Sequence, residues 1–482
     1  MKGIHISSLV FLGSAAIALV SFHTRKDASD QSAIAQVNAK KDTEGGSLLR
    51  KSWTKNAGMH RALDEVWLQV GDSIYGEGIF DHSGRKVSLS ADGLTLAIAS
   101  HFNSGENGSN SGSVRVYGFC ELARRWLQIG DDIDGNAAND NSGYSLSLSG
   151  DGMTVAIGAS QSDPNGVNSG SVRTYRWTED TTTANWEQVG DTLEGEAALD
   201  YFGTSVCLSA NGATLAIGAL AHDANGVDSG SATVYSLIVE DNGTTAASWV
   251  QIGNVIKGRE EYDHLGRSIY LSEDGTTLAV GASSNRYNGI NAGSVRLYRL
   301  IEASWSQIGG DISASVDGDH VGPSISLSAN GMVLAVGAFF NNDNADYAGT
   351  VRVYTYCPRA RQWTQMGEDI MGETQFDYFG RSVSLSADGM TFAAGAFSSV
   401  DEAELVGSVR VYRYTEENVA TADWQKVGNN IDGEGGFEYF GKAVSLSSDG
   451  TRVAVGAYKN DGADGGLRDI GNVRVFSLDE QI

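Results

Sequence analysis

A repeat of about 60 residues built around a tryptophan is the feature that most restricts how this chain of 482 residues can fold. In each copy, Gln or Lys follows two residues after the Trp, and an apolar residue and Gly come next. The copies begin at Trp67, Trp126, Trp186, Trp249, Trp305, Trp363 and Trp424. A constant period of this length is typical of repeat architectures. Because the seven copies fill residues 67–482, we expect one repeat array and not the several independent domains that the length alone would allow.

Each copy contains four strand signals. After the Trp segment comes a Gly, then alternating residues such as 205–209, and then Asp-Gly or Asn-Gly, the pair that a tight hairpin needs. A continuous apolar run such as 214–219 follows, and a polar loop leads to Gly-Ser-Val-Arg-Val-Tyr or a close variant. Four short antiparallel strands per copy predict an all-β fold, a seven-bladed β-propeller with four-stranded blades. A β-solenoid is the alternative, but solenoid coils are usually shorter and need caps that no copy resembles.

The two ends of the repeat array predict how the ring closes. The array starts with a lone Trp segment, and it ends on residues 471–476, which correspond to the third strand of a copy. We therefore predict that residues 67–74 supply the fourth, outer strand of the last blade.

Composition narrows the class of partner. With 41% hydrophobic residues, 61 Gly, only 3 Pro and 3 Cys, the chain has enough apolar residues for a core and is neither collagen-like nor a disulfide framework. Acidic residues outnumber basic ones by 60 to 34, which gives a formal charge of -26. Such a surface repels nucleic-acid phosphates, so we expect no nucleic-acid partner.

The first 66 residues differ from the repeats. Residues 1–23 contain an apolar run from Ile6 to Val20, and Ala16 and Ala18 suit cleavage of a secretory signal peptide. The run is shorter than the roughly 20 residues that span a bilayer, although Ser21 and Phe22 extend it enough to leave a signal anchor open. Residues 24–66 are polar without apolar periodicity, which predicts a disordered stalk. We expect a secreted protein, or a membrane-anchored one with the propeller outside.

Three segments point to a family. Residues 202–219, 379–396 and 440–457 each begin with Phe-Gly and end with Gly-Ala. They resemble the FG-GAP repeats that build the seven-bladed propeller of integrin α-subunits and related extracellular proteins. The resemblance implies a monomeric propeller that binds a protein or glycan ligand at a cell surface, with a role in adhesion. Calcium-binding members carry an Asp-x-Asp-x-Asp-Gly loop between the first two strands, where this chain has only a tight Asp-Gly turn.

A carboxylate stands three residues before the strand-opening Gly in every copy. The set is Asp81, Asp140, Asp200, Asp263, Asp319, Asp377 and Glu438. Such side chains can accept backbone N–H bonds in the loop that enters the inner strand, or they can form a ring that holds a cation. Their recurrence in every copy favours the structural role.

The next residue varies between copies, which makes it a better candidate for ligand contact. The set is His82, Asn141, Tyr201, His264, His320, Tyr378 and Tyr439. In a propeller these loops surround one opening of the central channel, so we predict a ligand-binding face there. A metal held by His264 and His320 with Asp263 or Asp319 is the alternative.

The loops between second and third strands are rich in Asp and Asn, whose oxygens calcium prefers. The candidate calcium ligands are Asp223, Asn225, Asp228, Asp343, Asp346, Asp461 and Asp464. Turn-forming residues alone would give the same composition, so calcium is a candidate cofactor and not a requirement. Asn107 and Asn242 lie in N-glycosylation motifs.

A third recurrent residue is the Arg of the third strand, present in all copies except the one with Thr233. For this Arg we expect a structural role, either pairing with the repeated carboxylate or stacking on the repeated Trp.

The function that the sequence favours is an extracellular binding or adhesion propeller. No nucleophile elbow, zinc-protease motif or phosphate-binding loop is present, which weakens an enzymatic interpretation without excluding it. The enzymatic alternative is a hydrolase or lyase of extracellular polysaccharide that uses Asp263, Asp319 or Asp377 as acid and base. A purely structural scaffold is a further alternative.

Overall fold

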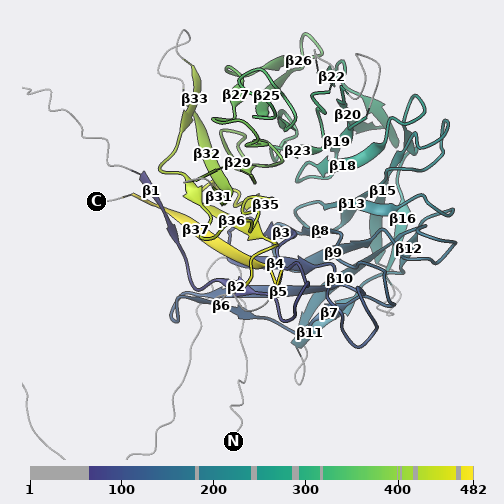
Figure 1. The fold of residues 1–482 in the computed structure, drawn as a ribbon. Helices are drawn as coiled ribbons and strands as arrows, with labels where there is room; N and C mark the ends of the chain where they lie inside the picture. Colours follow the sequence, from purple (N-terminus) through teal and green to yellow (C-terminus); the bar gives the residue numbers. More distant parts are fainter. Residues whose placement is uncertain are drawn as a thin grey trace, which may run out of the picture. The chain divides into compact units, whose positions relative to one another are not determined.

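The computed structural model describes residues 65–179, 184–239, 247–284, 292–314, 318–398, 400–401, 404–415, 422–462 and 468–480. In these residues the chain forms seven antiparallel sheets that surround a central axis as the blades of a propeller (Figure 1), as the repeats predict. None of the described residues belongs to a helix that is long and apolar enough to span a bilayer. The predicted signal segment and almost all of the predicted stalk lie outside the described residues, and the first strand begins at Glu65.

Each blade has an inner strand, two middle strands and an outer strand that comes in two pieces, because both pieces pair with the third strand. Blade 1 has β3 (Lys86–Leu89), β4 (Thr95–Ser100), β5 (Ser113–Cys120), β6 (Arg125–Gln128) and β7 (Ile133–Asp134). Blade 2 has β8 (Ser145–Leu148), β9 (Thr154–Ala159), β10 (Ser171–Glu179), β11 (Ala184–Gln188) and β12 (Leu193–Glu194). Blade 3 has β13 (Phe202–Leu208), β14 (Thr214–Ala219), β15 (Ser231–Val239), β16 (Ala247–Gln251) and β17 (Ile256–Lys257).

The remaining blades follow the same order. Blade 4 has β18 (Leu265–Leu271), β19 (Thr277–Ala282), β20 (Ser294–Ile301), β21 (Ser304–Gln307) and β22 (Ile312–Ser313). Blade 5 has β23 (Ser324–Leu327), β24 (Val333–Ala338), β25 (Thr350–Cys357), β26 (Gln362–Gln365) and β27 (Ile370–Met371). Blade 6 has β28 (Ser382–Leu385), β29 (Thr391–Ala396), β32 (Ser408–Thr415), β33 (Asp423–Lys426) and β34 (Ile431–Asp432), with a small hairpin of β30 (Val400–Asp401) and β31 (Glu404–Leu405) in one loop. Blade 7 has β35 (Ala443–Leu446), β36 (Arg452–Ala457), β37 (Asn472–Glu480), β1 (Glu65–Gln69) and β2 (Ile74–Tyr75).

The ring closes as predicted, by pairing the two ends of the repeat array. β1 runs antiparallel to β37 with Trp67 opposite Leu478, and β2 pairs further along the same strand with Ile74 opposite Val473. The strand order of blade 7 is therefore β1-β37-β36-β35, in which the outer strand comes from the beginning of the array. This confirms the closure by an N-terminal strand.

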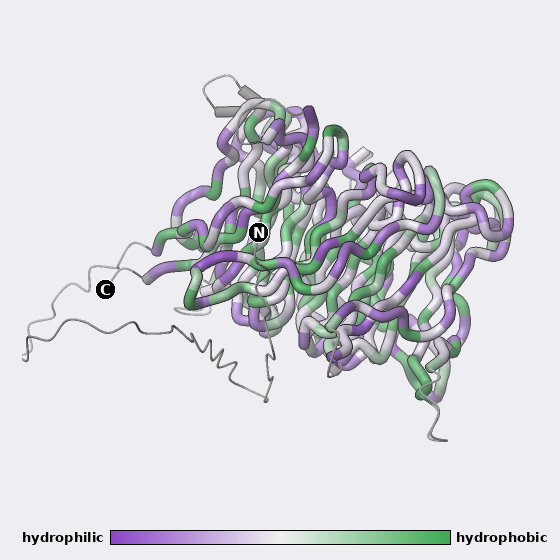
Figure 2. The backbone as a smooth tube through the Cα atoms, turned by 90° about the horizontal axis from the view of Figure 1, so that it is seen from below, coloured by the Kyte–Doolittle hydropathy of each residue, from purple (hydrophilic) through white to green (hydrophobic). Residues whose placement is uncertain are grey.

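The core lies between adjacent blades. In β14, Leu215 and Ile217 are completely buried, and they form one cluster with Ala156 of blade 2 and Trp249 of the outer strand. The continuous apolar runs of the second strands are thus covered on both faces, as expected of central strands. Figure 2 shows hydrophobic stretches running through the body of the ring, with hydrophilic residues in many of the loops.

The repeated Trp fastens each blade to the one before it. The indole N–H of Trp126 donates to the carbonyl of Val70 at 3.0 Å, and that of Trp67 donates to Val427 at 3.0 Å. Trp249 makes the equivalent contact with the hydroxyl of Thr174, at 2.7 Å. A buried indole usually has such a polar partner, which explains why the motif repeats once per blade.

Serines of the inner strands join neighbouring blades around the channel. The hydroxyl of Ser147 accepts the backbone N–H of Leu208 at 3.0 Å, and the hydroxyl of Ser384 accepts that of Leu446 at 2.9 Å. Two residues earlier on the same strand, the hydroxyl of Ser145 donates to the carbonyl of Gly203 at 2.7 Å. The alternating serines in the sequence are therefore interblade connectors, and an inner-strand residue of another type is a departure from this structural rule.

We expect Ser147→Ala to lower the free energy of unfolding by about 1–3 kcal/mol, because the buried N–H of Leu208 would lose its acceptor. Ser306→Ala, at an exposed position of β21, is the matched control and should change it by less than about 0.5 kcal/mol. Urea unfolding measures both values, and equal effects of the two variants would contradict the interblade role.

Candidate ligand-binding face and channel mouth

The loops that enter the inner strands have an unusual and constant backbone. In blade 6, Phe376 and Tyr378 have φ angles of 63° and 51°, in the left-handed region that bulky residues rarely adopt. Asp377 between them is fully buried and accepts the backbone N–H groups of Glu373 at 2.8 Å and Thr374 at 3.2 Å. The carboxylate thus holds a strained loop that presents the two flanking side chains, and such strain is often found at functional sites.

The other carboxylates of the set occupy equivalent places. Asp81, Asp140, Asp200, Asp263 and Glu438 each accept a backbone N–H from the residues three or four positions before them, and Asp319 accepts the side-chain amide of Asn341. This geometry favours the structural interpretation of the set over a free ring of carboxylates. Burial also raises the pKa of Asp140, Asp200 and Asp319.

The third-strand arginines contact these carboxylates in several blades. Arg296 lies 3.5 Å from Asp263, Arg410 lies 3.0 Å from Asp377, and Arg474 lies 2.9 Å from Glu438. The ring contacts that accompany two of these pairs involve the Phe of the Phe-Gly motif and not the repeated Trp. Arg410 lies over Phe379 and Arg474 over Phe440, at 5.3 and 4.2 Å from the ring centroids.

The residues that we predicted to form the ligand-binding face all lie next to these carboxylates with φ angles near +50°. Four of them, His82, His320, Tyr378 and Tyr439, contact aromatic residues that follow the second strands. The other three make polar contacts. Asn141 donates to Gln161, Tyr201 accepts from Asn168 at 3.5 Å, and His264 lies 3.2 Å from the hydroxyl of Ser284.

The aromatic contacts form a continuous series, here called the aromatic arc, over blades 5, 6, 7 and 1. Consecutive ring centroids in the arc lie 5.0 to 5.8 Å apart. Its members, in order, are His320, Phe340, Tyr378, Phe397, Tyr439, Tyr458, His82 and Phe102. The sequence pointed to alternate members, and it missed those contributed by the loops after the second strands.

The arc supplies polar groups as well as ring faces. All eight members are partly exposed. Burial lowers the pKa of His82 and of His320, so both imidazoles are neutral at pH 7 and each can donate one hydrogen bond and accept another.

Among the described residues, no three His, Cys, Asp or Glu side chains are arranged to hold a metal ion. Two of the candidate calcium ligands stabilise their own loops, since Asp223 accepts from the N–H of Asp228 at 2.8 Å and Asp461 from that of Asp469 at 2.9 Å. Asp346 accepts from Gln375 and Asn225 donates to Gly258, both in the loop of the next blade. Asp464 and the glycosylation candidate Asn242 lie outside the described residues. Asn107 uses its amide to donate to the carbonyl of Gly135 at 2.8 Å. Calcium binding and glycosylation stay predictions.

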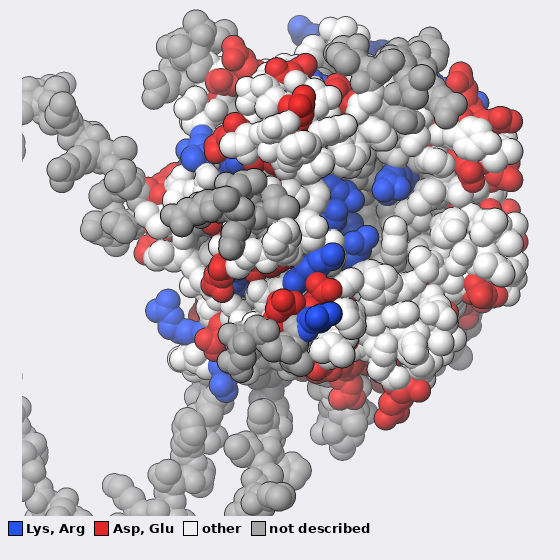
Figure 3. Space-filling view, viewed as in Figure 1, with Lys and Arg blue, Asp and Glu red and all other residues white. Residues whose placement is uncertain are grey.

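Next to the aromatic arc, the channel contains a cluster of positive charges that the sequence analysis did not identify. The channel has a cavity of about 360 Å³ lined by the inner strands. Its cationic residues, here called the cation cluster, are Arg85, Lys86, Arg267, Arg381 and Lys442. Figure 3 shows basic side chains gathered in the hollow of the ring, while acidic side chains lie mainly over the surrounding surface.

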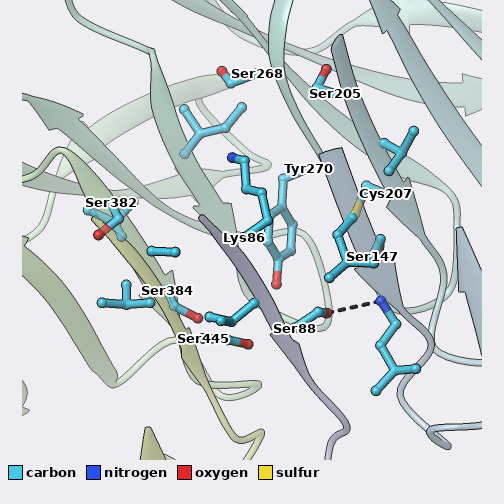
Figure 4. Close-up of a pocket in the computed structure, with 18 of the residues that line it drawn as sticks. Lys86, Ser88, Ser147, Ser205, Cys207, Ser268, Tyr270, Ser382, Ser384 and Ser445 are labelled. Atoms are coloured by element: carbon cyan, nitrogen blue, oxygen red, sulfur yellow. Dashed lines mark hydrogen bonds between the residues drawn. The ribbon is translucent and has the colours of Figure 1, made fainter. Parts of the chain in front are cut away.

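The residues of the cluster stand at two repeat positions where the residue type differs between blades. Arg85, Arg267, Arg381 and Lys442 directly follow the strand-opening Gly, where other blades have Tyr144, Thr204 and Pro323. Lys86 stands where blades 2 to 6 have the serine connector. Figure 4 shows Lys86 and Tyr270 projecting into a space where most of the other labelled residues are serines. A search for side chains that break the repeat would have found these residues.

The cations lower one another's pKa. Burial and the nearby Arg381, Arg85, Lys86 and Arg267 lower the pKa of Lys442 to about 6. Burial and the neighbouring arginines likewise lower the pKa of Lys86 to about 8 and that of Arg381 to about 10. A cluster with these properties favours any ligand that brings negative charge.

The two ends of the channel differ. Away from the cluster, backbone hydrogen bonds join successive blades, as from Ala387 to Ser448 and from Ser448 to Ala91, both at 2.9 Å. The acidic residue that lines the cavity, Glu273, belongs to this series through its bond to Ala329 at 3.1 Å. The channel therefore has a cationic mouth beside the aromatic arc and a tightly bonded end with small residues.

Comparisons with known proteins give one family match and several distant solved structures. Residues 133–175 and 192–235 match the family described as the FG-GAP repeat. No curated protein matches this chain. Similar solved structures include one described as "Structure of U3-55K", with 15% identity, coverage of 86% of this chain and 99% of that chain, and a TM-score of 0.45. The periplasmic gluconolactonase PpgL of Pseudomonas aeruginosa has 16% identity, coverage of 72% and 88%, and a TM-score of 0.43.

These solved structures are too distant to indicate a function. The family match covers two segments, and the seven equivalent blades come from the structure. The chain is a seven-bladed β-propeller in which residues 133–175 and 192–235 match the FG-GAP repeat.

Proposed function

We propose that this propeller is an extracellular binding module that recognises a glycan through the aromatic arc at the channel mouth. The observation that carries this proposal is the continuity of the arc, in which eight partly exposed rings from four blades border one opening. The secretion signal that the sequence predicts in residues 1–23 supports the extracellular location.

The chemistry of the arc suits a sugar. A Tyr ring offers an apolar face and a polar hydroxyl, so it can cover the C–H face of a sugar and bond to its hydroxyl groups. The neutral imidazoles of His82 and His320 add donors and acceptors. The channel beside the arc holds a separate cavity of about 360 Å³, at the small end of the range of about 300–1,000 Å³ for ligand pockets. A sugar on the arc could place one end or a side branch in this channel, which a flat protein surface could not do.

We expect Tyr378→Ala to weaken glycan binding by about tenfold or more, because stacking and burial of one aromatic ring contribute about 1–3 kcal/mol. The matched control is Tyr201→Ala, since Tyr201 holds the same repeat position in blade 3, where its hydroxyl accepts from Asn168 and the arc does not extend. A glycan array identifies the ligand, and calorimetry with that ligand measures both variants.

Equal losses in the two variants, or no loss in either, would contradict recognition by the arc. A turnover assay with the same glycan separates binding from catalysis. Product that disappears in Asp319→Asn would instead support the hydrolase or lyase alternative.

A further inference from the structure

Five cations without carboxylate partners lie together inside a strongly acidic protein. The chain has 60 acidic and 34 basic residues, yet Arg85, Lys86, Arg267, Arg381 and Lys442 form no ion pair within the part of the chain that the structure describes. Like charges at close range destabilise a folded protein unless something compensates them. Lys86 and Arg267 are exposed in the channel, but Arg85, Arg381 and Lys442 are only partly exposed, so solvent screens the repulsion among these three incompletely.

The third-strand arginines show how this fold compensates a buried cation when its role is structural. Arg296 pairs with Asp263 and with Asp311, at 3.5 and 3.1 Å. Arg474 pairs with Glu434 and with Glu438, at 3.0 and 2.9 Å. Each of these two cations has two carboxylates, whereas the buried Arg173 donates to the neutral acceptors Asn136 and Tyr175, both at 2.7 Å. The cation cluster forms no ion pair with any residue that the structure describes, so its charges are less compensated than those of Arg296 and Arg474.

Aromatic rings hold the cluster in place. The guanidinium of Arg381 lies 4.8 Å from the ring centroid of Phe339, and that of Arg85 lies 5.5 Å from the ring of Tyr458. The ammonium of Lys442 lies 4.4 Å from the ring of Phe397. Such ring contacts position a basic group without pairing it with a carboxylate, so these three groups remain available to a ligand. Tyr458 and Phe397 are also members of the aromatic arc, which makes the two surfaces continuous.

We propose that the cation cluster binds an oxyanion, a carboxylate or sulfate group carried by the glycan that the aromatic arc recognises. The evidence for an oxyanion site is the cation cluster itself. Only the assignment of the anion to a glycan rests on the proposed function. Arginine donors in a fixed fork suit carboxylate and sulfate oxygens, and desolvated charge-assisted hydrogen bonds are among the stronger ones.

The acidic side chains on the surface around the ring would limit which anions reach the site. At physiological salt the Debye length is about 8 Å, so the outer acidic residues act weakly on a group inside the mouth but oppose a polyanion that lies along the surface. A terminal or branch anionic sugar can place its charge in the channel without bringing further charges near the acidic rim. We therefore expect recognition of one charged residue and not of an extended polyanion.

The test uses inorganic sulfate and a glycan array as separate probes on the full propeller. Thermal unfolding is followed over a series of sulfate concentrations at constant ionic strength. The array carries uronate-containing and sulfated glycans beside their carboxyl-reduced and desulfated counterparts. The variant is the double substitution R381Q/K442Q, and the control is R359Q/K426Q, which replaces one arginine and one lysine at exposed positions away from the channel.

We expect sulfate to raise the melting temperature of the wild-type and control proteins saturably. R381Q/K442Q should weaken sulfate binding by about 100-fold, since each hydrogen bond to a charged group contributes about tenfold or more. On the array, acidic glycans should bind and their neutral counterparts should not, with binding lost in R381Q/K442Q only.

Other outcomes separate the two proposals. If sulfate binds as expected but no glycan does, the oxyanion site stands and the glycan function fails. If neutral glycans bind as well as acidic ones and R381Q/K442Q has no effect on them, the glycan function stands and the link to the cluster is overturned. A sulfate effect that is absent, or equal in R381Q/K442Q and R359Q/K426Q, overturns the oxyanion site.

Discussion

A chain that lacks residues 65–76 should not form a stable propeller, although it keeps all other strands of the seven blades. These residues contain β1 and β2, which complete blade 7. Trp67 is 4% exposed and packs in one cluster with Val427 of blade 6 and Phe476 of β37. Without it, blade 7 has an unpaired third strand, and the interface between blades 6 and 7 loses its central side chain. We expect circular dichroism to show loss of the cooperative thermal transition.

Two point variants separate ring closure from simple truncation. Trp67→Ala should lower the free energy of unfolding by about 3–5 kcal/mol, the usual cost of removing a large buried aromatic side chain. Leu68→Ala changes the next residue, which is 47% exposed, and should cost less than about 1 kcal/mol. A shortened chain that melts like the full one, or similar effects of the two point variants, would show that the ring does not depend on β1.

The affinity for sulfate should fall by up to tenfold for each pH unit between about pH 6 and 7.5. The pKa of Lys442 in the unliganded protein is about 6, so its side chain is mainly neutral at pH 7 and above. An oxyanion beside it favours the charged form and raises this pKa. Binding above pH 6 therefore takes up a proton, which costs free energy in proportion to pH. Below pH 6 the lysine is charged in both states and the affinity should level off.

Lys442→Arg is the best control for the coupling between sulfate binding and protonation of Lys442. Lys86, with a pKa of about 8, and Arg381, with a pKa of about 10, are mainly charged between pH 6 and 7.5. An arginine at position 442 would also stay charged, so the variant should bind sulfate with little dependence on pH between 6 and 7.5. Calorimetry in buffers of different ionisation enthalpy measures the proton uptake. A wild-type protein that binds sulfate without proton uptake would refute the assigned role of Lys442.

The fold could be predicted from the sequence because each repeated residue has one local task. The Trp donates to the preceding blade, the serines connect inner strands, and the carboxylate holds the loop before each inner strand. Seven repetitions made each pattern recognisable. The array begins with a fourth-strand segment and ends with a third-strand segment, and this predicted that the first strand completes the last blade. The exact starting point differed slightly, because β1 begins at Glu65 and not at Trp67.

The sequence predicted only part of the candidate site, because only some of its residues stand at repeated positions. The positions of His82, Tyr378 and Tyr439 varied between copies and drew attention, but their partners Phe397 and Tyr458 lie in loops whose lengths differ. Lys442 and Arg85 are more than 350 residues apart in sequence, and only closure of the ring brings them into one mouth. The net charge of -26 pointed away from a cationic site, because a total says nothing about how charges are distributed.

The most direct test of the cationic mouth is a crystal structure of the propeller with selenate, an anomalous scatterer that has the shape and charge of sulfate. We predict an anomalous peak within hydrogen-bond distance of Arg381 and Lys442, beside the arc residues Phe397 and Tyr458. The peak should be absent from crystals of R381Q/K442Q grown under the same conditions. Selenate bound only at outer surface residues, with the channel mouth filled by water alone, would contradict an oxyanion site.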